Sequence, residues 1–249
     1  MSINSKAALA AILLAGAIGA HAEAPVRNVV LVHGAWADGS SWGEVIPLLQ
    51  AAGLHVTAVQ NPLTTVEESV DATRRVLAQQ DGPTILVAHS WGGTVISEAG
   101  DDPKVVGLVY VAARAPDAGE DFVALSAKFP TMPVRAEVQN HDGQTVISEH
   151  GFLDYFANGV LHDKAEVLYA EQQPTTASLF AGRTKAAAWH AKPVYYAVSK
   201  QDLTISPDLE RFLAARMKAT TVEVDAGHLS LVSHPREVAD LILQAAGRK

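Results

Sequence analysis

The most informative stretch of this chain is Thr84–Gly93, TILVAHSWGG. Its first half is a short apolar run typical of a buried strand, and the residues from Gly92 onward are typical of a helix. Ser90 therefore stands in a tight turn between strand and helix, which holds a hydroxyl above a sheet and at a helix N-terminus. The turn brings backbones close together, so it needs small residues two positions before and two after the serine. Ala88 and Gly92 meet this need, although the usual pattern has glycine at both positions.

Strand-like and helix-like runs alternate on both sides of this turn. The strands are predicted at Asn28–His33, Leu54–Val59, Thr84–Ala88, Val105–Val111, Pro193–Ser199 and Thr220–Asp225. The helices are predicted at Ser41–Ala52, Thr65–Gln80, Gly92–Gly100, Pro207–Met217 and Pro235–Ala246. This alternation predicts an α/β fold with a mostly parallel, doubly wound, six-stranded sheet and helices on both faces.

The alternation stops between Ala112 and Lys192. A gap of about 80 residues is too long for bare loop in a compact domain. Helical candidates lie at Asp163–Gln172 and Thr175–Arg183, so we expect a helical lid at about 113–191, inserted after the fourth strand and lying over one end of the sheet. Its apolar residues are candidates either to line a pocket or to pack the lid onto the core: Phe122, Leu125, Phe129, Phe152, Tyr155, Phe156, Leu179, Phe180 and Trp189.

The first residues have the pattern of a secretory signal. Lys6 precedes an uncharged apolar stretch, residues 7–20, and the small residues of Ala20-His21-Ala22 follow it. At about 1.5 Å per residue this stretch spans about 21 Å as a helix, short of the roughly 30 Å core of a bilayer. We expect a cleaved signal peptide at residues 1–22, a mature domain at residues 23–249 and a periplasmic or secreted protein. An uncleaved anchor is the alternative.

Composition excludes several classes of protein. Apolar residues make up 48% of the 249 residues, more than a disordered chain carries. There is no cysteine, which excludes a disulfide scaffold and a cysteine-ligated metal centre. The formal net charge is −8 with no run of Lys or Arg, so nucleic acid is not an expected partner.

A serine hydroxyl is a poor nucleophile without a positioned base, and the chain offers ten histidines. His228 follows the last predicted strand, in the loop before the final helix. In a parallel sheet that loop opens at the same edge as the Ser90 turn, so His228 is the predicted base. His234 is expected at the start of the closing helix, and His89 is expected to pack beneath the nucleophile.

A carboxylate should orient the imidazole. Asp202 follows the strand Pro193–Ser199, and the chain order Ser90, Asp202, His228 is that of hydrolases with a strand–serine–helix turn. Asp117, which follows the strand ending at Val111, is the alternative acid.

Two backbone N–H groups should stabilise the oxyanion. One is expected from Trp91, directly after the nucleophile, and the other from Ala35 in the loop after the first strand. His33 and Trp36, on either side of that donor, are candidates to line the pocket.

The segments LVHGAWADGSSW, AHSWGGTVI and YVAARAPDAGE, with the Asp202 and Gly227-His228 loops, resemble the α/β-hydrolase superfamily. Within it, the chain resembles small bacterial esterase-like hydrolases related to plant methylesterases and hydroxynitrile lyases. The resemblance covers nearly the whole mature chain and implies a catalytic Ser90, Asp202 and His228. The lyases carry a lysine after the catalytic histidine and a threonine after the first-strand histidine. Leu229 and Gly34 stand there instead, which disfavours cyanide chemistry.

The sequence therefore predicts a serine hydrolase of the carboxylesterase type that cleaves a small carboxylic ester through an acyl-enzyme. The expected partner is a small-molecule ester. Neither a metal nor an organic cofactor is expected, and no membrane association after signal cleavage. Two alternatives stay open: a cofactor-free oxygenase or perhydrolase on the same fold, and a ligand-binding protein on a hydrolase scaffold.

Overall fold

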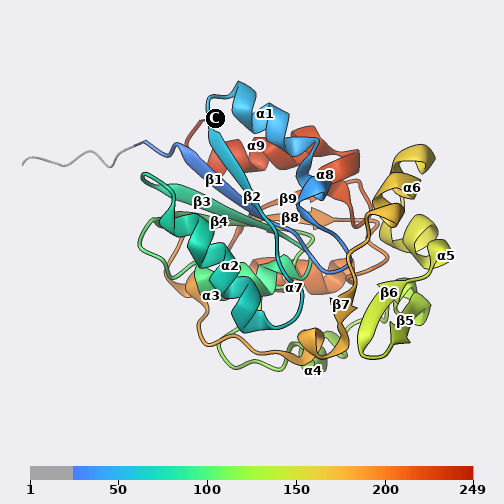
Figure 1. The fold of residues 1–249 in the computed structure, drawn as a ribbon. Helices are drawn as coiled ribbons and strands as arrows, with labels where there is room; N and C mark the ends of the chain where they lie inside the picture. Colours follow the sequence, from blue (N-terminus) through green and yellow to red (C-terminus); the bar gives the residue numbers. More distant parts are fainter. Residues whose placement is uncertain (1–24, 249) are drawn as a thin grey trace, which may run out of the picture.

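The computed structural model describes residues 25–248, so the predicted signal peptide at residues 1–22 lies outside the described part of the chain. A six-stranded sheet forms the centre of the molecule (Figure 1). Its strands are β1 (Asn28–Val32), β2 (His55–Val59), β3 (Thr84–His89), β4 (Val105–Val111), β8 (Val194–Ser199) and β9 (Thr220–Val224). Their order is β2-β1-β3-β4-β8-β9, and every neighbouring pair is parallel. The predicted strands agree with these to within one residue at each end.

Helices cover both faces of the sheet. On one face α1 packs against α9, and on the other α2 packs against α3, with α7 beside β8 (Figure 1). The bounds of these helices are Val45–Ala51 for α1, Val66–Ala78 for α2, Gly92–Ala99 for α3, Pro207–Arg216 for α7 and Pro235–Ala245 for α9. Two short elements complete this part: η1 (Gly39–Trp42) and α8 (Ser230–Ser233). The predicted doubly wound α/β architecture is confirmed.

Local sequence explains why these segments adopt their structure. Strands β1 and β3 are buried along their whole length, as expected of central strands covered on both faces. Helix α2 begins where the Thr65 hydroxyl accepts a hydrogen bond from the Glu68 N–H, and it buries one face that includes Val70 and Leu77. Helix α7 begins with Pro207, whose fixed φ suits the first helical turn.

The strand order creates a crevice beside β1 and β3. The chain leaves β1 toward β2 at one edge, and then returns to build β3 and the later strands on the other side. The loops after β1 and β3 therefore diverge at the carboxyl end of the sheet. Such a switch point is where open α/β sheets bind their ligands.

The insertion between β4 and β8 differs from the helical lid predicted from the sequence. It contains short helical elements but also a three-stranded antiparallel sheet in the order β5-β6-β7. Its elements are α4 (Phe122–Ser126), η2 (Pro133–Glu137), β5 (Val138–His141), β6 (Gln144–Ile147), α5 (Glu149–Gly151), η3 (Phe152–Phe156), α6 (His162–Ala170), β7 (Thr175–Thr176), η4 (Ala177–Ala181) and η5 (Ala188–His190).

The helix predicted at Asp163–Gln172 is present as α6, but the one predicted at Thr175–Arg183 is present only in its middle part, Ala177–Ala181. That segment begins as β7, which pairs with β6, and continues as the short helix η4. The β5–β6 hairpin turns at Asp142 and Gly143, both with positive φ, which is the backbone that an Asp-Gly turn favours. The pairing of β6 with β7 joins segments about thirty residues apart, and the hydrophobic periodicity within either segment does not predict it.

Among residues 25–248, no helix combines the length and the apolar character that crossing a bilayer requires.

Candidate active site

Ser90 lies in a strained turn at the end of β3. Its φ is +54°, a left-handed value that is uncommon outside glycine, and the next residues enter α3. The turn is tightly enclosed. A Cβ on Gly34 would lie 2.6 Å from the Ser90 Cβ, and one on Gly92 would lie 2.6 Å from the His33 carbonyl oxygen. Glycine at both positions lets the two loops approach and leaves the serine hydroxyl at the crevice.

The structure brings the three predicted catalytic side chains together. The His228 Nε2 is 2.9 Å from the Ser90 Oγ, and the His228 Nδ1 is 2.6 Å from the Asp202 Oδ2. The exposed fractions are 6% for Ser90, 1% for Asp202 and 0% for His228. Only the serine therefore reaches the crevice, while the imidazole and carboxylate behind it are shielded from water.

Backbone donors fix the Asp202 carboxylate. Its Oδ1 accepts hydrogen bonds from the N–H groups of Thr204, at 2.6 Å, and Ile205, at 2.8 Å. The other oxygen is then left for the His228 Nδ1–H. This division of the two carboxylate oxygens holds the imidazole in the tautomer whose Nε2 accepts a proton.

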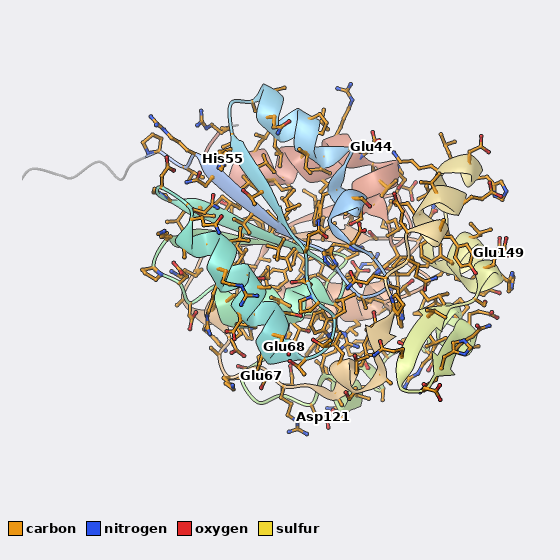
Figure 2. The ribbon with its side chains drawn as sticks, viewed as in Figure 1. Glu44, His55, Glu67, Glu68, Asp121 and Glu149 are labelled. Carbon is orange, nitrogen blue, oxygen red and sulfur yellow. The ribbon has the colours of Figure 1, made fainter. Side chains whose placement is uncertain are left out.

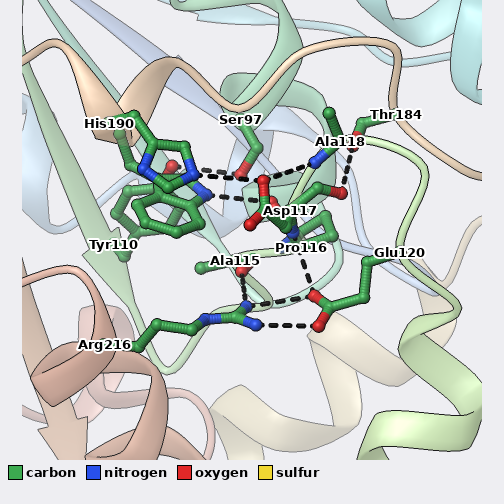
Figure 3. A network of polar contacts seen from close by, with 11 residues as sticks. Ser97, Tyr110, Ala115, Pro116, Asp117, Ala118, Glu120, Thr184, His190 and Arg216 are labelled. Carbon is green, nitrogen blue, oxygen red and sulfur yellow. Dashed lines mark hydrogen bonds and ion pairs between the residues drawn. The ribbon is translucent and has the colours of Figure 1, made fainter.

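The alternative acid, Asp117, lies in a separate network. Its carboxylate is 3.1 Å from the His190 Nε2 and accepts a hydrogen bond from the Ala118 N–H (Figure 3). In the same network Arg216 pairs with Glu120 (Figure 3). The partner of Asp117 is thus an exposed histidine of the insertion and not His228.

His89, which directly precedes the nucleophile, is buried and neutral. The His89 Nε2–H donates to the His228 carbonyl oxygen at 3.0 Å, and burial lowers the pKa of His89 well below its usual value. His89 packs against the His228 ring, with centroids 4.6 Å apart. His234 lies at the start of α9, as predicted, and its side chain makes no capping hydrogen bond.

His33 does not line the pocket, contrary to the prediction. It is completely buried: its Nδ1–H donates to the Gly34 carbonyl oxygen, and its Nε2 accepts from the Asn61 N–H. Burial lowers the pKa of His33, and both ring nitrogens already have partners. The side chain supports the loop from beneath, because the alternation of the strand turns it away from the crevice.

The two predicted oxyanion donors come from the loops after β1 and β3. Ala35 and Trp91 both line the cavity that Ser90 reaches. Within residues 25–248, neither of their backbone N–H groups donates to a protein acceptor. Both N–H groups are therefore available to an oxygen that develops charge next to the serine hydroxyl.

This cavity has a volume of about 390 Å³. Trp36 lines it, as predicted, and its indole Nε1–H donates to the Thr145 hydroxyl of the insertion. Of the nine apolar lid residues considered from the sequence, Phe122 and Phe180 line this cavity. The other seven pack the insertion onto the core.

Sequence reasoning missed three side chains around this site. Glu210 of α7 is fully buried, and its Oε2 accepts from the Ser199 N–H. Burial and the nearby Asp202 carboxylate raise the pKa of the Glu210 carboxyl well above its usual range. Asn158 of the insertion donates to the Gln201 carbonyl oxygen and accepts from the His228 N–H, so it joins the two loops that carry the acid and the base.

The third is Arg114, which follows β4 and lines the cavity. In the sequence, Arg114 is visible only as part of the motif YVAARAPDAGE. Its role at the cavity could not be predicted, because local sequence does not show where a side chain in the loop after a strand points. Within residues 25–248, no group of three or more His, Asp or Glu side chains is arranged to hold a metal ion.

Known proteins share this fold. The model of the alpha/beta hydrolase family matches residues 29–241. The carbendazim hydrolyzing esterase of Nocardioides sp. is 33% identical over 117 residues, covering 41% of this chain and 48% of that protein. Putative methylesterase 19 of Arabidopsis thaliana is 26% identical over 259 residues, covering 89% of this chain and 98% of that protein. In the solved structures, polyneuridine aldehyde esterase matches with a TM-score of 0.76 at 20% identity, covering 88% of this chain and 98% of that one.

These comparisons confirm the resemblance to α/β-hydrolases and plant methylesterases drawn from the sequence motifs. The match spans about half the length of the Nocardioides esterase, at 48%, and nearly all of the plant protein, at 98%. The solved structure, at 20% identity, supports the fold alone. The substrates in the names of these relatives belong to those proteins and do not identify the substrate of this chain.

Proposed function

Because this chain belongs to the alpha/beta hydrolase family, we propose that it is a serine hydrolase that cleaves a small carboxylic ester. One observation carries the proposal: the hydrogen-bond path from Asp202 through His228 to Ser90, with distances of 2.6 and 2.9 Å. A hydroxyl needs such a base to act as a nucleophile. The names of the related esterase and methylesterase support an ester as the substrate.

The reaction begins with the Ser90 hydroxyl attacking the ester carbonyl carbon while His228 takes its proton at Nε2. Asp202 accepts the Nδ1–H throughout and stabilises the imidazolium. The tetrahedral oxyanion accepts hydrogen bonds from the N–H groups of Ala35 and Trp91. His228 then protonates the leaving alkoxide, and the alcohol departs. Water, deprotonated by the same histidine, hydrolyses the acyl-serine and releases the carboxylic acid.

The experiment is turnover of p-nitrophenyl acetate by wild type and by Ser90→Ala. The variant keeps the fold but loses the nucleophile, so kcat should fall by about three orders of magnitude or more. A fluorophosphonate probe should label the wild type at Ser90 and leave the variant unlabelled. Retention of more than about a tenth of the activity would remove Ser90 from the mechanism.

The same two proteins separate an ester hydrolase from a ligand-binding protein and from a hydroxynitrile lyase. A ligand-binding protein on this scaffold would neither turn over the ester nor react with the probe. A hydroxynitrile lyase would release cyanide from mandelonitrile in a Ser90-dependent way without hydrolysing esters. We expect no enzymatic cyanide release, because Leu229 supplies no positive charge beside the base.

Export is the second part of the proposal. It rests on the pattern of residues 1–22 alone, with Lys6, the apolar stretch and Ala20-His21-Ala22. Cleavage after Ala22 would release the hydrolase domain into the periplasm or the medium. The N-terminal sequence of the protein recovered from its host tests this directly.

A further inference from the structure

The cavity beside Ser90 is lined by two arginines and by no acidic residue of the described chain, residues 25–248. The two are Arg114, in the loop after β4, and Arg135, in η2 of the insertion. This arrangement contrasts with the whole protein, whose formal net charge is −8. The acidic side chains of Glu44, Glu67 and Glu149 lie at the periphery of the molecule (Figure 2).

Arg114 is held firmly at the cavity wall. Its guanidinium lies 4.9 Å from the centre of the Phe122 ring and 5.2 Å from that of the Phe180 ring. One N–H donates to the Phe180 carbonyl oxygen at 3.3 Å. Its own backbone N–H donates to the Ser90 carbonyl oxygen at 3.0 Å, which fixes the arginine next to the nucleophile. The edge of the guanidinium retains donors, because a guanidinium carries five N–H groups.

Among the residues that the structure describes, 25–248, neither cavity arginine belongs to an ion pair. Several other arginines of residues 25–248 have carboxylate partners: Arg74 with Asp101, Arg183 with Asp121, Arg211 with Glu223 and Arg216 with Glu120. Burial and the nearby positive charge of Arg135 lower the pKa of Arg114 to about 10, which leaves it charged at neutral pH. Two like charges that face one cavity are an unfavourable arrangement, which a bound anion would relieve.

Packing alone does not explain this residue. The space between Phe122 and Phe180 could be filled by an apolar side chain without the desolvation cost of a charge. A guanidinium at that place is suited to a planar anion, since its fork matches the two oxygens of a carboxylate. The cavity of about 390 Å³ is large enough for a substrate with one small ring or short chain beside its ester.

We infer that the substrate is an ester that carries a free carboxylate, which Arg114 binds at its guanidinium edge and Arg135 attracts at the mouth of the cavity. This inference rests on the proposed ester hydrolysis at Ser90. The reaction is unchanged: water cleaves the acyl carbon–oxygen bond and yields an acid and an alcohol. The carboxylate takes no part in bond breaking and serves to orient the ester toward the serine.

Two matched substrate pairs test the inference in the wild type. Monomethyl terephthalate carries its carboxylate on the acyl side, and methyl para-carbamoylbenzoate is its neutral counterpart. Para-acetoxybenzoate carries the carboxylate on the alcohol side, and para-acetoxybenzamide is its neutral counterpart. In each pair the shape is conserved and the charge differs. We expect kcat/KM for the acid to exceed that for the amide by about tenfold or more in at least one pair, the usual effect of a charge-assisted hydrogen bond.

Variants assign the preference to particular residues. Arg114→Gln should bring the acid-to-amide ratio down to about one, and Arg114→Lys should keep part of it, because it keeps the charge but loses the fork. Arg135→Gln should lower the ratio less, because that side chain is exposed and its charge is screened. Arg74→Gln is the matched control: it removes the same charge from an exposed position on α2 and should leave the ratio unchanged.

An acid-to-amide ratio of kcat/KM near one for both pairs in the wild type would overturn the inference. A high ratio that is unchanged in both Arg114→Gln and Arg135→Gln would also overturn it. If Arg114→Gln fails to fold, the inference is tested by the acid-to-amide ratio of kcat/KM in the wild type and by its change in Arg135→Gln. Hydrolysis of p-nitrophenyl acetate without any preference for acids would reject the anionic substrate and leave the esterase standing. If no ester is cleaved, the proposed function fails. Calorimetric titration of Ser90→Ala with monomethyl terephthalate and with its amide then decides the inference by binding, and equal affinities reject it.

Discussion

Replacing Asp202 by asparagine tests the catalytic arrangement more sharply than removing the nucleophile. The Asp202 Oδ1 accepts two backbone hydrogen bonds, from Thr204 at 2.6 Å and Ile205 at 2.8 Å. In Asp202→Asn the amide oxygen must stay at that position, because an NH2 group there would face two donors. The NH2 group is then directed at the His228 Nδ1, which has to become an acceptor.

The consequence for the base follows from its tautomer. With Nδ1 as acceptor, the neutral imidazole carries its proton on Nε2, which lies 2.9 Å from the Ser90 Oγ. That nitrogen then donates to the serine and cannot take its proton. The corresponding change in a serine protease lowers kcat by about 10⁴. We expect a similar loss, which amounts to about 5 kcal/mol of transition-state stabilisation.

Steady-state hydrolysis of p-nitrophenyl acetate measures this loss, with thermal unfolding as a check on the fold. Asp117→Asn is the matched control, since it removes the same charge from a carboxylate that pairs with exposed His190. It should change kcat by about twofold or less, as surface ion pairs contribute little. A loss below about tenfold in Asp202→Asn, or a larger loss in Asp117→Asn, would refute the assignment of the acid.

Three further predictions concern pH and export. The pKa of the Glu210 carboxyl is raised in the folded state, so the folded protein keeps a proton that the unfolded chain loses above about pH 4.3. The free energy of unfolding therefore falls as the pH rises from there toward the folded pKa. Glu210→Gln should remove that fall, and urea unfolding of both proteins at about pH 5 and pH 8 checks it. Burial lowers the pKa of His33 and of His89, so below about pH 6.5 the unfolded state binds more protons and the protein loses stability on acidification. In that window His33→Gln should reduce the slope by up to about 1.4 kcal/mol per pH unit, measured by the same unfolding experiment. The exported protein should begin at or near Glu23 by N-terminal sequencing, whereas an intact Met1 in the membrane fraction would support an anchor.

Local sequence was sufficient for the sheet and the nucleophile turn. The strands are short apolar runs bounded by turns, and their alternation with helices admits few arrangements other than a doubly wound parallel sheet. Ser90 was predictable for the same reason, because the strand, the serine and Gly92 are adjacent in the chain. Asp202 and His228 followed from the rule that the loops after parallel strands open at one edge.

The secondary structure of the insertion could not be predicted in the same way. Strand β7 joins the small sheet by pairing with β6, a segment far away in the chain, and Thr175–Thr176 has no local pattern that distinguishes a strand from a helix start. The Asp142-Gly143 pair was the one available signal, since Asp-Gly between two short polar runs favours a hairpin.

The motifs that carry the candidate chemistry could be recognised in the chain alone, because the residues of each motif are neighbours in sequence. Only the folded structure shows that Asp202, and not Asp117, is hydrogen-bonded to His228, since both aspartates follow a strand of the same sheet. It also buried His33 and turned Arg114 into the cavity. The direction of a side chain beyond a strand end depends on what packs against it from distant segments, here the loops and the insertion that enclose the serine. Periodicity carries no information about those contacts.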